Sequence, residues 1–199
     1  MYTAPQDSDL TEAMFRVLSD GSSPPVQVND PLPSGSYFDY FAITPNSSRV
    51  VYWADRQTDE VYELYSVPLA GGSAPVKLNG TLIANGDVQT DFQISPDSSR
   101  VVYYGDQDTD AVRELYSVAL TGGAAPVKLN GPMVSGGEAF GYFPFSPDSS
   151  QVFYYADQET DDLVEIFVTY EAPLYYQTNI ILAAALSYFL IQPTSLIIT

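Results

Sequence analysis

Carboxylates at alternate positions in one short polar segment are the residues best suited to bind a metal ion. Asp106, Asp108 and Asp110 stand at every second position, and Glu114 comes four residues later. Calcium is a hard cation that binds clustered carboxylate oxygens, and calcium loops place their ligands at alternate positions. The sequence therefore marks Asp106, Asp108, Asp110 and Glu114 as candidate calcium ligands.

The same segment also fits an exposed hairpin turn, in which Asp and Thr side chains hydrogen-bond the local backbone. A calcium loop needs a glycine at its sharp bend, but Glu60, Ala111 and Asp162 stand there in three related segments. The other two segments carry less regular acids: Asp55, Gln57, Asp59 and Glu63, and Asp157, Glu159, Asp161 and Glu165. We expect the hairpin turn, with calcium as the alternative.

Cysteine and histidine are both absent from the 199 residues. This composition excludes thiolate catalysis, disulfides, zinc–cysteine sites and any base or triad that depends on histidine. The glycine patterns of nucleotide-binding loops and of the serine-hydrolase nucleophile are absent as well. We therefore expect a chain that is not an enzyme, with no catalytic residue and no cofactor apart from the calcium alternative.

The charge balance limits the classes of partner. The chain has 25 Asp and Glu against 7 Lys and Arg, a net charge of −18. Phosphate backbones and anionic membrane surfaces attract basic patches, so we expect neither nucleic acid nor membrane as a partner. The excess of acids predicts a solvated acidic surface.

A repeat with a period of 51 residues runs through the chain. Three segments align without gaps from Phe41, Phe92 and Phe143, and they read FAITPNSSRVVYWAD, FQISPDSSRVVYYGD and FPFSPDSSQVFYYAD. The register continues downstream, where TDEVYELYSV matches TDAVRELYSV, and LAGGSAPVKLNG matches LTGGAAPVKLNG. A strict period of this length is typical of solenoids and propellers.

Each repeat divides into four strand-like runs, which in the second full repeat are Phe92–Ser95, Val101–Tyr104, Glu114–Leu120 and Pro126–Asn130. The short turns favour an antiparallel meander. The second run is apolar on both faces, as expected between two propeller blades, and the lysine of the fourth suits an outer edge. The sequence predicts an all-β propeller of four-stranded antiparallel blades. A β-sandwich is the alternative, but it would not explain the strict return of the same four strands.

Two recurring motifs are interpreted as structural. The run Ser-Pro-Asp-Ser-Ser is a turn, in which Asp97 and Asp148 can accept N–H groups two residues on, as Asn46 can. Aromatic residues recur in register in the second run, which predicts core between blades rather than a platform for sugar or peptide. They are Tyr52, Trp53, Tyr103, Tyr104, Tyr154 and Tyr155.

The run F-x-[IF]-[ST]-P-[DN]-S-S-[RQ]-V, followed by an acidic turn and E-L-Y-S-V, resembles the WD-like propeller repeats of the TolB type, especially in bacterial extracytoplasmic proteins. The resemblance covers residues 1–168 and recurs in register. It implies a propeller fold, a protein-binding or scaffold role, and a periplasmic or secreted setting. TolB-type repeats also form the propeller domain of prolyl-oligopeptidase-like hydrolases, so the repeat does not fix the function.

The predicted blades do not close a propeller. We expect a partial blade at 1–30, full blades at 31–80 and 81–131, and a partial blade at 132–168. These supply about 14 strands, whereas a four-bladed propeller, the smallest usual kind, needs about 16. The sequence therefore predicts an arc of about 3.5 to 4 blades.

A non-repeat tail, 169–199, follows the last blade. It has no charged residue from Ala172 onward, and Ile180–Ile191 is apolar except for Ser187. An apolar core this short does not meet the length of a membrane span, so membrane contact through 174–191 is the least favoured interpretation. The alternatives are a cap on the open blade edge or non-native sequence at a gene end.

Three functional hypotheses remain. The chain is a non-enzymatic propeller segment that binds a protein or ligand, an accessory propeller of a hydrolase whose catalytic domain is elsewhere, or a truncated gene remnant. We expect no signal peptide, because MYTAPQDSDL has neither a basic nor an apolar region. Because the repeated motifs are interpreted as scaffold, we expect function in the less regular connectors, 30–40, 80–91 and 131–142.

Overall fold

The computed structural model describes residues 2–5 and 12–170, and over these residues the chain is all β, with no helix. Fourteen strands form four antiparallel sheets, each of which follows chain order. The first sheet contains β1 (Tyr2–Pro5), β2 (Glu12–Arg16) and β3 (Val26–Gln27). The second contains β4 (Phe38–Ile43), β5 (Arg49–Thr58), β6 (Val61–Pro68) and β7 (Val76–Lys77).

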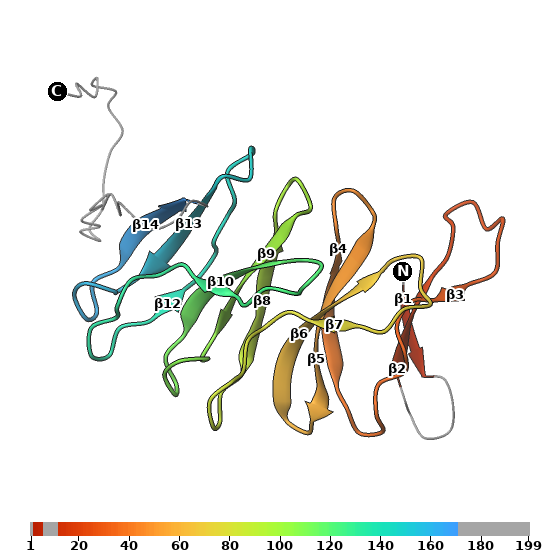
Figure 1. Ribbon diagram of the computed structural model, residues 1–199, viewed down its shortest axis with the longest axis horizontal. Helices are drawn as coiled ribbons and strands as arrows, with labels where there is room; N and C mark the ends of the chain where they lie inside the picture. The colour runs from red at the N-terminus through yellow and green to blue at the C-terminus, as the bar shows by residue number, and fades with distance from the viewer. Residues whose placement is uncertain (1, 6–11, 171–199) are drawn as a thin grey trace, which may run out of the picture.

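The remaining two sheets repeat this plan. The third sheet contains β8 (Val88–Ile94), β9 (Arg100–Gly105), β10 (Glu114–Ala119) and β11 (Val127–Lys128). The last sheet contains β12 (Ala139–Phe140), β13 (Gln151–Ala156) and β14 (Glu165–Tyr170). The four sheets stand side by side in one row, with the first and the last at opposite ends (Figure 1). The prediction of an all-β partial propeller is confirmed.

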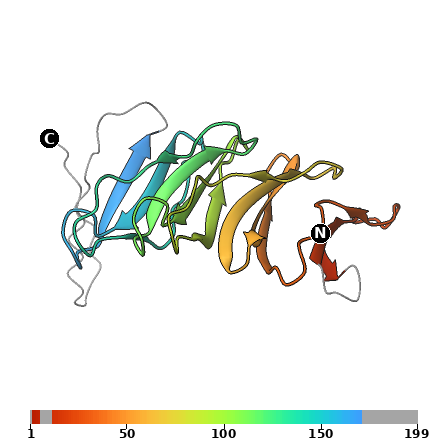
Figure 2. The same cartoon turned by 60° about the horizontal axis from the view of Figure 1, so that its bottom comes forward.

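The core lies between the sheets, because the second strand of each of the last three sheets carries apolar residues on both faces. Val50 and Tyr52 of β5 pack against the first sheet, whereas Val51 and Trp53 pack against the third. This alternation follows from the two-residue period of a strand. Each sheet is thereby covered by its neighbours, and the sheets face one another along the row (Figure 2). The aromatic residues of the second run therefore form core, as predicted, except that Tyr155 is exposed.

The Ser-Pro-Asp-Ser-Ser turn closes on itself and also reaches the next sheet. The Ser95 hydroxyl accepts the N–H groups of Ser99 and Arg100 at 3.2 and 2.9 Å and donates to Asp97 Oδ1 at 2.6 Å. The Asp97 N–H donates to Ser149 Oγ of the following turn at 3.1 Å. The motif is thus a structural turn that ties adjacent sheets together.

A glycine lets another turn approach the preceding sheet. Gly122 follows β10 with a φ of 67°, a conformation that favours glycine. A Cβ at this position would collide with the Val76 side chain on β7. The repeated Gly-Gly pair therefore serves both the turn and the packing of consecutive sheets.

The predicted tail, 169–199, begins within β14, and its residues from 171 onward, including most of the apolar stretch and all of 174–191, lie outside the described residues. Within residues 2–5 and 12–170, we find no helix long and apolar enough to cross a membrane.

Candidate functional site

The acid that follows each second strand is buried and holds the connector in front of the first strand. Asp106 accepts the N–H of Asp87, and its own N–H donates to the Asp87 carbonyl at 3.1 Å. In the last sheet, Asp157 accepts the N–H of Glu138 at 2.7 Å. Asp55 accepts the N–H of Tyr37 in the second sheet. Asp106, the first candidate calcium ligand, is therefore engaged with the backbone.

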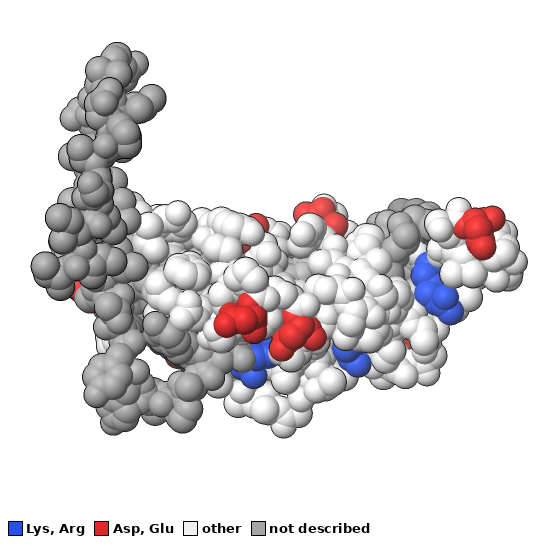
Figure 3. All heavy atoms as spheres, turned by 90° about the horizontal axis from the view of Figure 1, so that it is seen from above, with Lys and Arg blue, Asp and Glu red and all other residues white. Residues whose placement is uncertain are grey.

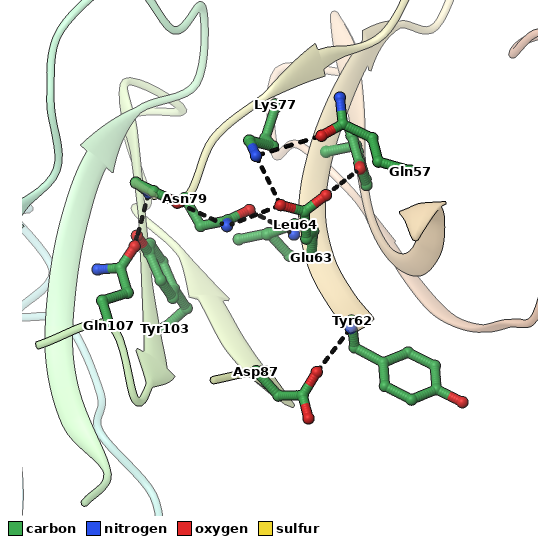
Figure 4. A network of polar contacts seen from close by, with 11 residues as sticks. Gln57, Tyr62, Glu63, Leu64, Lys77, Asn79, Asp87, Tyr103 and Gln107 are labelled. Carbon is green, nitrogen blue, oxygen red and sulfur yellow. Dashed lines mark hydrogen bonds and ion pairs between the residues drawn. The ribbon is translucent and has the colours of Figure 1, made fainter. Parts of the chain in front are cut away.

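In the second and third sheets, an acid in the third strand is buried against a lysine and a tyrosine. Glu114 accepts the Tyr116 hydroxyl at 2.7 Å through Oε2 and pairs with Lys128 through Oε1. Burial, together with the bond to Glu114, raises the pKa of Tyr116. The equivalent Glu63 accepts the Tyr65 hydroxyl and Lys77 Nζ, both at 2.6 Å; Figure 4 shows the contact with Lys77.

The remaining two candidate ligands lie at the surface. Asp108 forms an ion pair with Lys128 at 3.1 Å, and Asp110 is exposed. A lysine ammonium thus sits between Asp108 and Glu114, where a calcium ion would need both carboxylates. Over the described ranges, no group of three or more Asp, Glu, His or Cys residues is arranged to hold a metal ion. Calcium binding stays a prediction.

The residue at the bend after the acidic segment has a positive φ, which is the conformation that a glycine would adopt there. Ala111 has a φ of 57°, and Glu60 and Asp162 have φ values of 60° and 61°. The bend residue therefore has the same left-handed backbone in all three repeats, whatever its side chain, although only in the second sheet does the strand continue to the bend, with Thr58 paired to Val61. This supports the hairpin interpretation of the acidic segment.

Amides extend this polar network across the junctions between sheets (Figure 4). Asn79 Oδ1 accepts the Leu64 N–H at 3.0 Å within the second sheet. The neighbouring Gly80 N–H donates to Gln107 Oε1 of the third sheet at 2.6 Å, and the Tyr103 hydroxyl donates to the same oxygen at 3.2 Å. Buried polar groups need such partners, so these repeated residues are structural.

A groove between the first strands of the second and third sheets has a different character. Its volume is about 260 Å³, and residues of β4 and β8 line it. The lining residues are Asp39, Tyr40, Thr90, Asp91, Phe92 and Gln93. Four of these six lie in the connectors in which we expected function, 30–40 and 80–91, and Phe92 and Gln93 belong to the repeated motif.

Irregularities in two strands place these residues at the surface. The pairing of β4 with β5 shifts between Phe38 and Phe41, and the pairing of β8 with β9 shifts between Val88 and Phe92. A bulge leaves extra residues unpaired and changes the direction of their side chains. Asp39 and Tyr40 lie within the first shift, and Gln89, Thr90 and Asp91 lie within the second.

The groove combines carboxylates with aromatic rings. Asp39 and Asp91 are exposed, and neither has a hydrogen bond or a close ion pair within residues 2–5 and 12–170, although Arg113 attracts Asp91 at longer range. Tyr40 is 47% exposed, and its ring meets Phe92 edge to face at 5.1 Å. Carboxylates attract a cation by Coulomb forces, and an aromatic face adds a cation–π contribution. The groove is thus suited to a positively charged group.

Charged side chains do not form one continuous band on the face shown in Figure 3, where acidic and basic groups lie in small separate clusters. On this face the negative charge therefore does not mark a single site. The groove is distinguished instead by two aromatic residues, Tyr40 and Phe92, beside two carboxylates.

Comparison with solved structures finds chains of similar fold. No family model and no curated protein matches the chain. The structure is similar to a protein from Agrobacterium tumefaciens that is assigned as a TolB, with a TM-score of 0.53 and 18% identity over 79% of this chain and 51% of that protein. It is also similar to an oligogalacturonate lyase in complex with manganese, with a TM-score of 0.51 and 16% identity over 85% of this chain and 47% of the lyase.

The chain spans about half the length of these two structures. At this level of identity the similarity concerns the fold alone. The in-register repeat, the row of antiparallel meander sheets and the two likenesses together show that the chain has the fold of a TolB-type β-propeller.

Proposed function

We propose that the chain is a non-enzymatic propeller scaffold, outside the cytoplasm, that binds a cationic segment of a partner protein in the groove between β4 and β8. The observation that carries this proposal is the pair of exposed carboxylates, Asp39 and Asp91, which line the groove beside the Tyr40 and Phe92 rings. Lysine and arginine side chains satisfy both features, because they carry positive charge and pack on aromatic faces.

The charge of the whole chain supports the same class of partner. A net charge of −18 attracts a basic segment over long distances and accelerates its association. At short range, the carboxylates and aromatic rings of the groove then orient the bound basic segment. Edge positions of a sheet also present unpaired backbone groups, to which an extended peptide can bind.

The likeness to a lyase does not extend the proposal to catalysis. The chain has no histidine or cysteine, and the described residues offer no cluster of metal ligands. An oligogalacturonate carries many carboxylates, which Asp39 and Asp91 would repel. An accessory role beside a catalytic domain is the second candidate, favoured by the lyase likeness and by the half-length coverage.

The test is fluorescence anisotropy with labelled peptides of the same length that differ only in whether their charged positions carry lysine or glutamate. We expect the basic peptide to bind, and its affinity to fall as salt rises, because exposed charges are screened. The acidic peptide should not bind. Equal binding of all peptides, or binding of the basic peptide that salt does not affect, would contradict the proposal.

The extracytoplasmic part of the proposal is supported by the TolB likeness and by the absence of cysteine. Fractionation of the source cells, followed by detection of the native protein, tests it separately. We expect the protein in the fraction outside the cytoplasmic membrane, and recovery with the cytosol would contradict this part alone.

A further inference from the structure

Each described junction between sheets uses the same pair of faces. We call the face toward the following sheet the leading face and the face toward the preceding sheet the trailing face. At the junction of the second and third sheets, the leading residues Val51 and Trp53 pack on the trailing residues Tyr103, Tyr116 and Val118. At the next junction, the leading residues Val102, Tyr104 and Leu115 pack on the trailing residues Val152, Tyr154 and Phe167 of the last sheet.

Within residues 2–5 and 12–170, no sheet packs on the leading face of the last sheet. Tyr155 stands where Trp53 and Tyr104 stand in the two earlier sheets, yet it is 38% exposed, whereas they are 8% and 2% exposed. Val164, which is equivalent to Tyr62, is exposed as well. Tyr155 therefore presents to solvent an aromatic position that is core in the two earlier sheets, and Val164 is a second exposed apolar residue just before β14.

The trailing face of the first sheet is open in the same way. Val17 is equivalent to Val67 and Val118, which are 0% and 1% exposed, but Val17 itself is 43% exposed. The two open faces lie at opposite ends of the row of sheets (Figure 1), so a single copy does not join them in this arrangement.

We propose that a second copy of this chain covers both faces, through a head-to-tail pair in which the leading face of each last sheet packs on the trailing face of the other copy's first sheet. The proposal rests on complementarity, because the two faces are the halves of an interface that the molecule already repeats between its own sheets. A heterologous interface closes into a ring when the rotation permits it. Two copies supply eight sheets, which is within the four to eight blades usual for closed propellers.

The negative charge of the chain predicts how the association of two copies depends on salt. Each copy carries a charge of −18, so two copies repel each other at low ionic strength, whereas the burial of apolar surface does not depend on screening. Association should therefore strengthen as salt rises. The peptide binding proposed above should weaken under the same change, so the failure of one proposal is distinguishable from the failure of the other.

The test is the mass of the purified 199-residue chain by light scattering after gel filtration, at physiological and at higher salt. We expect twice the chain's 21.7 kDa, with a larger paired fraction at higher salt. A monomer at all concentrations would overturn the proposal. Particles that grow with concentration without reaching a fixed size would overturn the closed pair.

Two variants and one control test the faces themselves. Val17→Asp and Tyr155→Asp should each give a monomer that melts cooperatively. Val127→Asp, at an exposed position on the outer strand β11, should leave the pair intact. An equimolar mixture of the two face variants should recover pairs. The unaltered leading face of the Val17→Asp variant can then pack on the unaltered trailing face of the Tyr155→Asp variant. If V17D alone prevents pairing and Y155D has no effect, the interface is not head-to-tail.

Discussion

The acids of the repeat and the acids of the groove have opposite surroundings. Glu63 and Glu114 are buried, and each accepts a tyrosine hydroxyl and pairs with a lysine. Asp39 and Asp91 are exposed, and neither has a hydrogen bond or a close ion pair among the described residues. The repeated acids are therefore committed to the structure, whereas the groove acids are available to a ligand.

The difference has a physical cause. A buried carboxylate is costly unless it is paired and hydrogen-bonded, so a repeat that buries one must also carry its partners in register. An exposed carboxylate has no such requirement, and its position can vary from one repeat to the next. Asp39, Thr90 and Gly141 occupy one set of equivalent positions, and in the next set Asp91 stands where Tyr40 stands in the preceding repeat. Recurrence in this chain thus indicates structure, and variation indicates the surface available for binding.

The largest expected contrast is between two tyrosines. Tyr103 is fully buried between the second and third sheets, so Tyr103→Ala should lower the free energy of unfolding by about 3–5 kcal/mol. Tyr40→Ala, at the groove, should change it by less than about 0.5 kcal/mol. Urea denaturation followed by tryptophan fluorescence measures both. Similar losses in the two variants would remove the distinction between scaffold and groove.

A smaller contrast separates the two kinds of acid. Glu114→Ala leaves the buried Tyr116 hydroxyl without its acceptor and Lys128 without its partner, which should cost about 1–3 kcal/mol. Asp91→Ala removes an exposed carboxylate and should be nearly neutral in the same denaturation assay. If E114A were as stable as the unaltered chain, the repeated acids would not be structural.

The next smaller expected effect is on how the melting temperature falls at acidic pH. Hydrogen bonds from Ser146 and Ser150 lower the pKa of Asp148 to about 2, and the Ser95 and Ser99 bonds lower that of Asp97. A carboxyl group with a lowered pKa contributes stability above its ordinary value of 3.8, and the contribution disappears as the pH falls toward 2. Asp97→Asn with Asp148→Asn should flatten the loss of melting temperature over this pH window.

The equivalent turn of the second sheet provides the control for that experiment. Asn46 already stands in it and accepts the Ser48 N–H at 3.0 Å, so an amide is compatible with the geometry. The double variant should fold at neutral pH. An unchanged acid limb would show that these turns do not contribute to the pH dependence.

Calcium should have the smallest effect. Because Lys128 contacts both Asp108 and Glu114, we expect millimolar calcium to leave the melting temperature unchanged relative to chelator at matched ionic strength. A calcium-specific rise would instead support the ligand set Asp106, Asp108, Asp110 and Glu114, since a ligand that binds only the folded state must stabilise it.

The sequence predicts the scaffold well because each repeat carries its own strand and turn signals. One repeat shows the turn at Ser95, the strand Val101–Tyr104 with two apolar faces, and the outer strand with Lys128. The same motifs return one period away, which supports each assignment. Sequence reasoning interpreted Lys128 as protection of an edge. It missed the pair with Glu114, because the two residues are brought together only by the register of β10 and β11.

The groove is predictable only in part. The irregular connectors show where the repeat is interrupted, and on this basis the sequence predicts function in 30–40 and 80–91. The register shifts in β4 and β8, however, depend on how each strand pairs with its neighbour. No local signal identifies Tyr40 as the residue that packs on Phe92, because the two lie in different sheets.

The central claim is that the variable residues of the groove bind the partner, whereas the residues that recur in each repeat stabilise the fold. The most direct measurement compares two double variants that remove the same charge. Asp39→Asn with Asp91→Asn alters the groove, and Asp59→Asn with Asp110→Asn alters exposed acids of the repeated turn. In anisotropy with the basic peptide, the groove variant should lose at least about tenfold in affinity without a change in melting temperature, whereas the turn variant should bind as the unaltered chain does. Equal losses in the two variants would contradict the claim, because binding would then follow net charge alone.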